Sequence, residues 1–344
     1  MRALVKYAHG VGNMEIRDVP IPTIAEDEVL VKVKCVGVCG TDIKVYDDEF
    51  VNFPPVIVGH EFGGEIVETG SAVTDYKKGD RVVSEQHFGA CGKCEYCLTG
   101  KRHFCPSKKS PGYISDGAYA DFIAVKENLL HRIPEKLTYE EAALLEPMGI
   151  AAHALFEKCR INPQDKVVIL GCGPIAIMAL QIVRAIGAES VIMTCMDVDE
   201  AVRRPLALSL GADDVINVQH RDAIKEVHEI YGGGADVVVD LAGAPAAINS
   251  GFKMLRKDGS FCAIGLPHGD IPIPWQSLVM GAFNVYFSFS SGYKTWERCL
   301  SMIAQGKIKL DAYTQSVYPL EDWYTALEDA RKGKVLKAII RVSE

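Results

Sequence analysis

Residues 166–176, KVVILGCGPIA, decide the fold of a large part of this chain. A short apolar run is followed by a glycine turn and then by an apolar segment that reaches about Gly187. In a strand–turn–helix unit of this kind, glycine at 171 permits the tight turn, glycine at 173 lets the backbone approach a pyrophosphate, and Ala176 packs helix on strand. The free N–H groups of the helix N-terminus then meet the phosphate charge. The pattern predicts dinucleotide binding; the alternative is a glycine turn in a domain that binds no nucleotide.

Strands and helices continue to alternate on the C-terminal side of this motif. The runs VIMTC, DVIN, DVVVDLAG and SFCAIG are continuously apolar, as in parallel strands that are buried on both faces. We therefore expect an α/β protein with a doubly wound Rossmann domain over residues 156–287. Its predicted cofactor-binding residues in the turn are Gly171, Gly173, Pro174 and Ile175.

An acidic residue after the second strand distinguishes NAD from NADP, because it binds the ribose hydroxyls. Counting along VIMTCMD, the strand should end at Cys195, and Asp197 lies two residues later. Arg203 and Arg204 follow closely and are either contacts for a 2′-phosphate or solvated helix residues. We expect NAD with Asp197 as the acid, and keep NADP as the alternative.

The first part of the chain has a different pattern. The segments LVKVKCVGV, EIVETG and GDRVVS are short strands punctuated by Gly and Pro, which predicts a β-rich, barrel-like domain. The tail from about residue 290 reads as two helices and a strand that return to it. A chain of 344 residues is long enough for two domains. We assign residues 1–155 and 288–344 to the β-rich domain.

Four of the eleven cysteines cluster in residues 91–105, where CGKCEYC is followed by one more cysteine. Four thiolates complete the tetrahedral shell of a structural zinc. A thioredoxin-type pair would need a βαβ context, and a chance cluster of free thiols is the other alternative. A closed shell leaves no open position, so this metal should hold a loop and do no chemistry. The predicted ligands are Cys91, Cys94, Cys97 and Cys105.

A second candidate metal site combines Cys39 in GVCGTD, His60 and Glu61 in GHEFGGE, and Glu146 in LLEPMG. Each alone is ordinary: a core cysteine, a hydrogen-bonded histidine, a charge at a helix end. Together they supply a thiolate, an imidazole and carboxylates, and a catalytic zinc keeps one open position beside three such ligands. An open zinc lowers the pKa of a bound alcohol, whose alkoxide can release hydride to a nicotinamide.

The ordered motifs GVCGTD, GHEFGGEIVETG, KKGDRV, CGKCEYC, LLEPM, VVILGCGPIA and LGADDVIN resemble the zinc-dependent medium-chain dehydrogenase/reductase family over nearly the full length. Within it, Glu146 followed by Pro147 is similar to the sorbitol (polyol) and threonine dehydrogenase branch. The resemblance implies a GroES-like catalytic domain in two segments around a Rossmann domain, with two zinc ions. Cys39 and His60 would be constant ligands. Glu61 and Glu146 would alternate, or one would bind directly and the other through water.

The resemblance also implies that Thr41 takes the substrate proton. The histidine that often ends the proton relay, five residues after the ligand cysteine, is here Lys44. Lys44 could relay the proton only if its pKa were lowered. In the alternative interpretation, Lys44 contacts the cofactor phosphates. His87 is a further candidate, for which a plain loop histidine is the simpler interpretation.

The predicted function is therefore hydride transfer between a secondary alcohol (a polyol, sugar or sugar derivative) and NAD(P), which gives a ketone. Alternatives are an L-threonine 3-dehydrogenase-like or a 2,3-butanediol-type enzyme. A non-catalytic nucleotide-binding relative, or a quinone reductase, should lack Cys39, His60 and Glu146.

The formal net charge of −8 argues against a nucleic-acid partner. The sequence contains no apolar run of about 18 residues, so we expect no membrane helix. The start MRALVKYAHG lacks the apolar core of a signal peptide. We expect a cytoplasmic protein. The resemblance implies a homotetramer or homodimer, and residues 284–293, NVYFSFSSGY, are the candidate edge strand between subunits.

Overall fold

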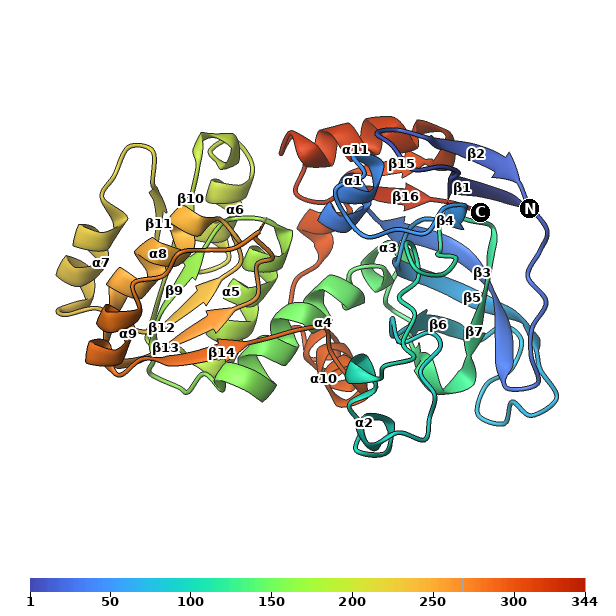
Figure 1. The fold of residues 1–344 in the computed structure, drawn as a ribbon, viewed down its shortest axis with the longest axis horizontal. Coiled ribbons are helices and arrows are strands. Elements are labelled where there is room, and N and C mark those ends of the chain that lie inside the picture. Colours follow the sequence, from blue (N-terminus) through green and yellow to red (C-terminus); the bar gives the residue numbers. More distant parts are fainter. Residues whose placement is uncertain (268, 344) are drawn as a thin grey trace. The chain divides into compact units, whose positions relative to one another are not determined.

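The computed structural model describes residues 1–267 and 269–343 (Figure 1). The chain forms two compact units. The first unit comprises Met1–Pro147, Ser291–Ala304 and Leu310–Glu344, and the second comprises Met148–Ser290 and Gln305–Lys309. Within the described ranges, every helix is too short or too polar to cross a bilayer.

The first unit is built around a seven-stranded sheet in the order β15–β16–β3–β5–β6–β8, with β7 paired to β3. A smaller sheet has the order β2–β1–β4. This β-rich unit confirms the predicted GroES-like fold. The strands are β1 (Arg2–Lys6), β2 (Met14–Asp18), β3 (Glu28–Gly37), β4 (Val56–Ile57), β5 (Glu61–Thr69), β6 (Arg81–Ser84), β7 (Phe122–Lys126), β8 (Leu130–Arg132), β15 (Val317–Pro319) and β16 (Ile339–Arg341).

The pairing of β3 with β5 positions the candidate metal site. The two strands are antiparallel, and Gly37 at the end of β3 lies opposite Glu61 at the start of β5. Both strands bury most of their side chains in one apolar core. The chain that leaves β3 is therefore held beside the chain that enters β5. The helices of this unit are α1 (Gly40–Tyr46), α2 (Glu95–Leu98), α3 (Tyr139–Ala142), α10 (Tyr293–Ala304) and α11 (Trp323–Arg331).

The second unit contains a six-stranded sheet in the order β11–β10–β9–β12–β13–β14, all parallel. The chain moves outward from β9 to β11, then returns to β12 on the other side of β9. This is the Rossmann strand order, and the predicted doubly wound fold is confirmed. The strands are β9 (Lys166–Leu170), β10 (Ser190–Cys195), β11 (Asp214–Asn217), β12 (Ala235–Asp240), β13 (Leu255–Ala263) and β14 (Asn284–Phe287).

Helices α5 (Pro174–Ile186), α6 (Arg203–Ser209), α7 (Ala223–Tyr231), α8 (Pro245–Met254) and α9 (Trp275–Gly281) accompany this sheet (Figure 1). Ligands of such sheets bind outside the carboxyl ends of the strands, where the strand order reverses. In this unit the strand order reverses between β9 and β12. The glycine turn follows the carboxyl end of β9 and therefore lies at this point.

Candidate functional site

Cys39, His60 and Glu61 meet in the first unit. Their ligand atoms (a sulfur, an imidazole nitrogen and a carboxylate oxygen) all lie within 4.8 Å of one another. Cys39 is the N-cap of α1, just beyond β3, while His60 and Glu61 stand where β5 begins. The β3–β5 register thus brings together residues that are more than twenty positions apart in the sequence.

The chemistry of this cluster fits a zinc ion. His60 and Glu61 are buried, and Oε1 of Glu61 has no hydrogen-bond partner among the described residues. Buried polar atoms normally have partners, so an orphaned carboxylate oxygen beside a thiol and an imidazole calls for a cation. Burial, followed by the Glu61 charge, raises the pKa of the Cys39 thiol well above its ordinary value. A bound dication would reverse that shift.

The other oxygen of Glu61 is held by a lysine from the C-terminal segment. Lys337 Nζ lies 2.5 Å from Glu61 Oε2, and both side chains are almost completely buried. Gly37 is needed here, because a Cβ at this position would overlap the Glu61 carboxylate. The ion pair therefore orients Glu61 with one oxygen toward Lys337 and leaves the other oxygen unpartnered.

Glu146 lies in the first turn of α4 (Leu145–His153) and is buried. It is not a member of the set in which all ligand atoms lie within 4.8 Å of one another. Burial, and next the charge of Glu61, raise its pKa from 4.5 to about 7. The two carboxyl groups are thus close enough to repel each other, but only Glu61 joins Cys39 and His60.

Behind His60 stands Asp42, which sequence reasoning missed. Asp42 Oδ1 lies 3.6 Å from His60 Nδ1, and Tyr119 donates its hydroxyl to Asp42 Oδ2 at 3.2 Å. Asp42 Oδ2 also accepts the backbone N–H of Cys39 at 2.9 Å. The distance to His60 Nδ1 is longer than a hydrogen bond, so Asp42 acts on His60 through its charge, and it lies on the side of the ring opposite to the nitrogen that would bind a metal. The motif GVCGTD contained this residue, but its partner His60 could be found only in the fold.

Thr41 and Lys44 lie on α1 and are half-buried. Helix α1 begins directly after Cys39, so Thr41 is within two residues of the candidate ligand. His87 lies elsewhere: it is buried, and its Nε2 is 2.7 Å from the carbonyl oxygen of Ser291 and 3.1 Å from Glu85. His87 therefore belongs to a hydrogen-bonded cluster beside the four-cysteine segment.

The four sulfurs of Cys91, Cys94, Cys97 and Cys105 also lie within 4.8 Å of one another. The sulfurs of Cys91 and Cys105 are 3.7 Å apart, much longer than a disulfide bond. Backbone N–H groups of Lys93 and Cys94 lower the pKa of Cys91 from 9.0 to about 6. A convergent set of four sulfurs, one with a stabilised thiolate, fits a tetrahedral zinc.

The glycine turn of the second unit has the geometry of a pyrophosphate site. Gly171 has φ +101° and its N–H donates to Thr194 Oγ1 at 2.9 Å. Gly173 is the N-cap of α5, and Pro174 is its first residue. A Cβ on Gly173 would meet no atom, so the space above the turn is open to a ligand. Ile175 follows in the first turn of α5.

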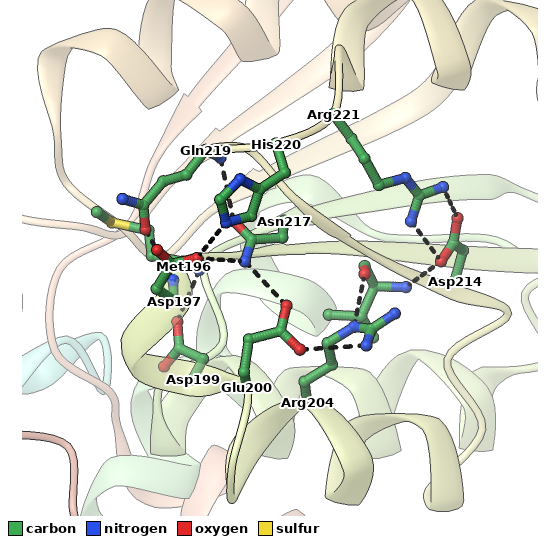
Figure 2. Close-up of polar contacts among 11 residues, drawn as sticks. Met196, Asp197, Asp199, Glu200, Arg204, Asp214, Asn217, Gln219, His220 and Arg221 are labelled. Carbon is green, nitrogen blue, oxygen red and sulfur yellow. Dashed lines mark hydrogen bonds and ion pairs between the residues drawn. The ribbon is translucent and has the colours of Figure 1, made fainter.

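Strand β10 ends at Cys195, as the sequence predicted, and Asp197 stands two residues beyond it. Figure 2 shows the polar contacts around Asp197. Its Oδ1 accepts hydrogen bonds from Asn217 Nδ2 at 2.9 Å and from the His220 ring at 2.7 Å. These bonds, that of Asn217 first, lower the pKa of Asp197. The side chain remains half exposed, so it is a fixed anion that a ligand can reach.

The nearby arginines are engaged by other acids. Arg203 lies 2.9 Å from Asp199. Arg204 lies 3.2 Å from Glu200, as Figure 2 shows. Both pairs join an acid that precedes α6 to an arginine in the first turn of α6, four positions later. Each arginine therefore already has a carboxylate partner.

Two family models match the chain. The alcohol dehydrogenase GroES-like domain matches residues 25–135, and the zinc-binding dehydrogenase model matches residues 174–305. The chain is 36% identical to D-arabitol-phosphate dehydrogenase of Enterococcus avium, over 99% of this chain and 97% of that one. It is 35% identical to sorbitol dehydrogenase of Halalkalibacterium halodurans, over 99% of each.

An L-threonine 3-dehydrogenase of Bacillus licheniformis is 34% identical over 99% of this chain and 98% of that one. Among solved structures, 2R,3R-butanediol dehydrogenase of Bacillus subtilis superposes with a TM-score of 0.89 at 26% identity, over 99% of each chain. These matches cover both units and confirm the family resemblance that the sequence motifs indicated.

Proposed function

Since the chain belongs to the family of zinc-dependent, NAD(P)-linked alcohol dehydrogenases, we propose that it oxidises a secondary alcohol within a polyol or polyol derivative to a ketone, with NAD as the acceptor. The observation that carries this proposal is the cluster of half-buried Cys39 with buried His60 and Glu61, whose ligand atoms converge within 4.8 Å of one another. The curated relatives named for arabitol phosphate and sorbitol support the polyol class.

The chain's own residues would divide the work as follows. Cys39, His60 and Glu61 would hold the zinc, which lowers the pKa of the alcohol hydroxyl. Asp42, whose carboxylate lies 3.6 Å from His60 Nδ1, would stabilise the ring orientation that turns the other nitrogen to the metal. The hydroxyl of Thr41 would accept the proton of the alcohol and pass it on.

The reaction balances as two transfers from the secondary alcohol. The carbinol carbon would give its hydrogen as hydride to the nicotinamide of NAD, the hydroxyl proton would leave through Thr41, and the C–O bond would become a carbonyl. The products are a ketone, NADH and a proton. No covalent enzyme intermediate is required.

We infer a preference for NAD over NADP from the surroundings of Asp197. A fixed carboxylate at this position accepts hydrogen bonds from the 2′- and 3′-hydroxyls of the adenosine ribose and repels a 2′-phosphate. The bonds from Asn217 and His220 hold Asp197 in place, while Arg203 and Arg204 are paired with Asp199 and Glu200.

The four-cysteine segment would bind the second zinc and keep it closed to substrate. The thiols of this cluster are free, as are the other cysteines in the described ranges, and free thiols persist in a reducing compartment. We infer a cytoplasmic location on this ground.

We infer that two copies associate through β14 and α9. Strand β14 is the edge of the second unit's sheet. Large apolar side chains on these elements are exposed: Trp275 by 70%, Val279 by 64%, Met280 by 73% and Phe287 by 76%. An unpaired strand edge beside such a surface favours pairing with a second copy. A tetramer would need a further surface, and sedimentation of wild type and Phe287→Lys distinguishes dimer, tetramer and monomer.

The test of the activity is NADH formation by the zinc-loaded protein with polyols, polyol phosphates, 2,3-butanediol and L-threonine, each with NAD and with NADP. Oxidation of a polyol or its phosphate, lost in Cys39→Ser, supports the proposal. Oxidation of L-threonine alone would replace the polyol class with an amino alcohol. If the protein carries two zinc ions per chain and oxidises none of these alcohols, the proposed activity on this class of substrates is wrong.

A further inference from the structure

Asp240 is a completely buried acid at the carboxyl end of β12. Strand β12 lies between β9 and β13 (Figure 1). Three loops leave the sheet at this edge: the glycine turn after β9, residues 241–243 after β12, and residues 264–266 after β13. Ligands of such sheets bind at the carboxyl ends of the strands. A residue that joins these loops therefore shapes the binding surface.

The side chain of Asp240 holds the loop that follows its own strand. Its Oδ1 accepts the backbone N–H groups of Ala242 and Gly243, each at 3.1 Å. This loop in turn packs on the glycine turn, because a Cβ built on Gly171 would lie 3.4 Å from the Ala242 nitrogen. Asp240 therefore fixes Ala242 against the turn that would receive the pyrophosphate.

Asp240 also holds the loop that follows β13. Its backbone carbonyl accepts the N–H of Gly265 at 3.0 Å. Glycine is needed at 265, because a Cβ there would lie 2.9 Å from Asp240 Oδ2 and would overlap the backbone of Gly243. On the two loops that Asp240 joins, Ala242 and Leu266 are exposed apolar residues.

The second oxygen of Asp240 lies in an apolar setting. Oδ2 is buried and has no hydrogen-bond partner among the described residues. Burial raises the pKa of this carboxyl, although the N–H groups of Gly243 and Ala242 act in the opposite direction. A buried carboxylate oxygen without a donor favours the protonated acid, and an asparagine side chain has the same shape. Asp240 therefore contributes shape and hydrogen bonds rather than a negative charge.

The position of Asp240 in the sheet indicates which half of the cofactor it serves. A dinucleotide lies across the point where the strand order reverses, with one nucleotide on each side. Asp197, beyond β10, would face the adenosine ribose, so the nicotinamide half would lie over β12 and β13. Ligand pockets are lined mostly by apolar groups, and the exposed Ala242 and Leu266 suit a flat ring there.

We propose that Asp240 is the positioning residue for the nicotinamide half of the cofactor, and that by its shape and hydrogen bonds it holds the loops after β12 and β13 in the arrangement that receives the ring. Because its own side chain is completely buried, it acts through these loops and does not touch the cofactor. The inference goes beyond the proposed function, since it needs only cofactor binding and does not depend on which alcohol is oxidised.

The test compares the binding of NADH with that of ADP-ribose, which has the pyrophosphate and both riboses but no nicotinamide. Isothermal titration calorimetry of the zinc-loaded protein gives both dissociation constants without turnover. In Asp240→Ala we expect the Kd for NADH to rise about tenfold or more, because the cofactor must then order the loops itself. The Kd for ADP-ribose should stay close to the wild-type value, since Thr194 still holds the glycine turn through the Gly171 N–H.

Three further variants separate shape from charge and from general stability. Asp240→Asn retains the acceptor oxygen and the shape, so it should bind NADH almost as the wild type does. Gly265→Ala leaves Asp240 intact but forces a Cβ against Gly243, so it should show the same selective loss as Asp240→Ala. The matched control is Asp236→Ala, because Asp236 lies near the other end of β12 and is paired with Arg256. It should change the binding of neither ligand.

Equal losses for NADH and ADP-ribose in Asp240→Ala would overturn the proposal, because Asp240 would then support the whole nucleotide site. A selective loss that Asp236→Ala reproduces would also overturn it, and so would an Asp240→Asn protein that binds NADH as weakly as Asp240→Ala does. If Asp240→Ala does not fold, Gly265→Ala decides the same comparison. A protein that binds NADH normally but oxidises no alcohol would contradict the proposed function alone.

Discussion

Lys337 Nζ and Glu61 Oε2 lie 2.5 Å apart in the core of the first unit, although Glu61 begins β5 and Lys337 lies two residues before β16. Both side chains are almost completely buried. The pair joins the C-terminal segment to the candidate metal site, so the return of the chain to its first domain completes the site as well as the sheet.

Lys337→Met should leave Glu61 as a buried anion without its partner. Breaking a buried pair in this way costs about 3–5 kcal/mol in folding stability. We expect that loss in urea unfolding of the metal-free protein and a smaller loss in the zinc-loaded protein, where the metal compensates the charge. The control is Lys334→Met, which breaks an exposed pair with Asp329 and should cost about 0–1 kcal/mol. Equal losses with and without zinc would argue against metal binding by Glu61.

Cys39→Ser should abolish alcohol oxidation and reduce the zinc content from two ions per chain to one. The serine hydroxyl is a much poorer zinc ligand than a thiolate. The matched control is Cys299→Ser, since Cys299 is a buried cysteine of α10 outside both clusters. Metal analysis together with the rate separates loss of the metal from loss of folding. Retention of two zinc ions in Cys39→Ser would exclude Cys39 as a ligand.

Cys105→Ser should release the zinc of the four-cysteine segment and loosen the loop that follows it. We expect faster proteolysis within residues 91–110 and a lower rate, with the other zinc still bound. The reason is that structural zinc sites contribute directly to folding energy. Mass spectrometry of the first cleavage products locates the loosened segment, and cleavage elsewhere in the chain would contradict this assignment.

The stability of the metal-free protein should fall as pH rises between about 5 and about 7, in part because of Glu146. Its folded-state pKa is raised from 4.5 to about 7, first by burial and then by Glu61. The folded state therefore binds more protons than the unfolded state between these two pKa values. The stability that protonated Glu146 contributes is lost as pH rises through its folded-state pKa. Urea midpoints across this range should show a shallower decline in Glu146→Gln. An unchanged slope in that variant would contradict the raised pKa.

Asp197→Ala should lower kcat/KM for NAD by about tenfold or more, because hydrogen bonds to a charged group contribute about 1.5–3 kcal/mol. The gain for NADP should be smaller, since Arg203 and Arg204 remain paired with Asp199 and Glu200. Initial rates with both cofactors measure the ratio. The control is Asp214→Ala, which removes the carboxylate of the first residue of the neighbouring strand β11, where it is paired with Arg221. If the NAD-to-NADP ratio changed equally in both variants, Asp197 would have no special role in cofactor choice.

Several features could be predicted because they are local. The turn around Gly171 needs a positive φ and an open approach, and both requirements appear as glycine in the sequence. The end of β10 at Cys195 was found by counting along one apolar run. The cysteines of residues 91–105 are close in the chain, so their spacing already indicated that their sulfurs could converge.

By itself, the sequence therefore determined the two fold types, the nucleotide turn, the four-cysteine cluster and the residue types of the second metal site. Only the tertiary structure decided how the carboxylates of that site are arranged. It places Glu61 with Cys39 and His60, puts Asp42 behind His60, and gives Lys337 to Glu61. The reason is physical: short-range motifs encode backbone turns and nearby ligands, whereas the partner of a buried charge is set by strand register and chain closure across hundreds of residues.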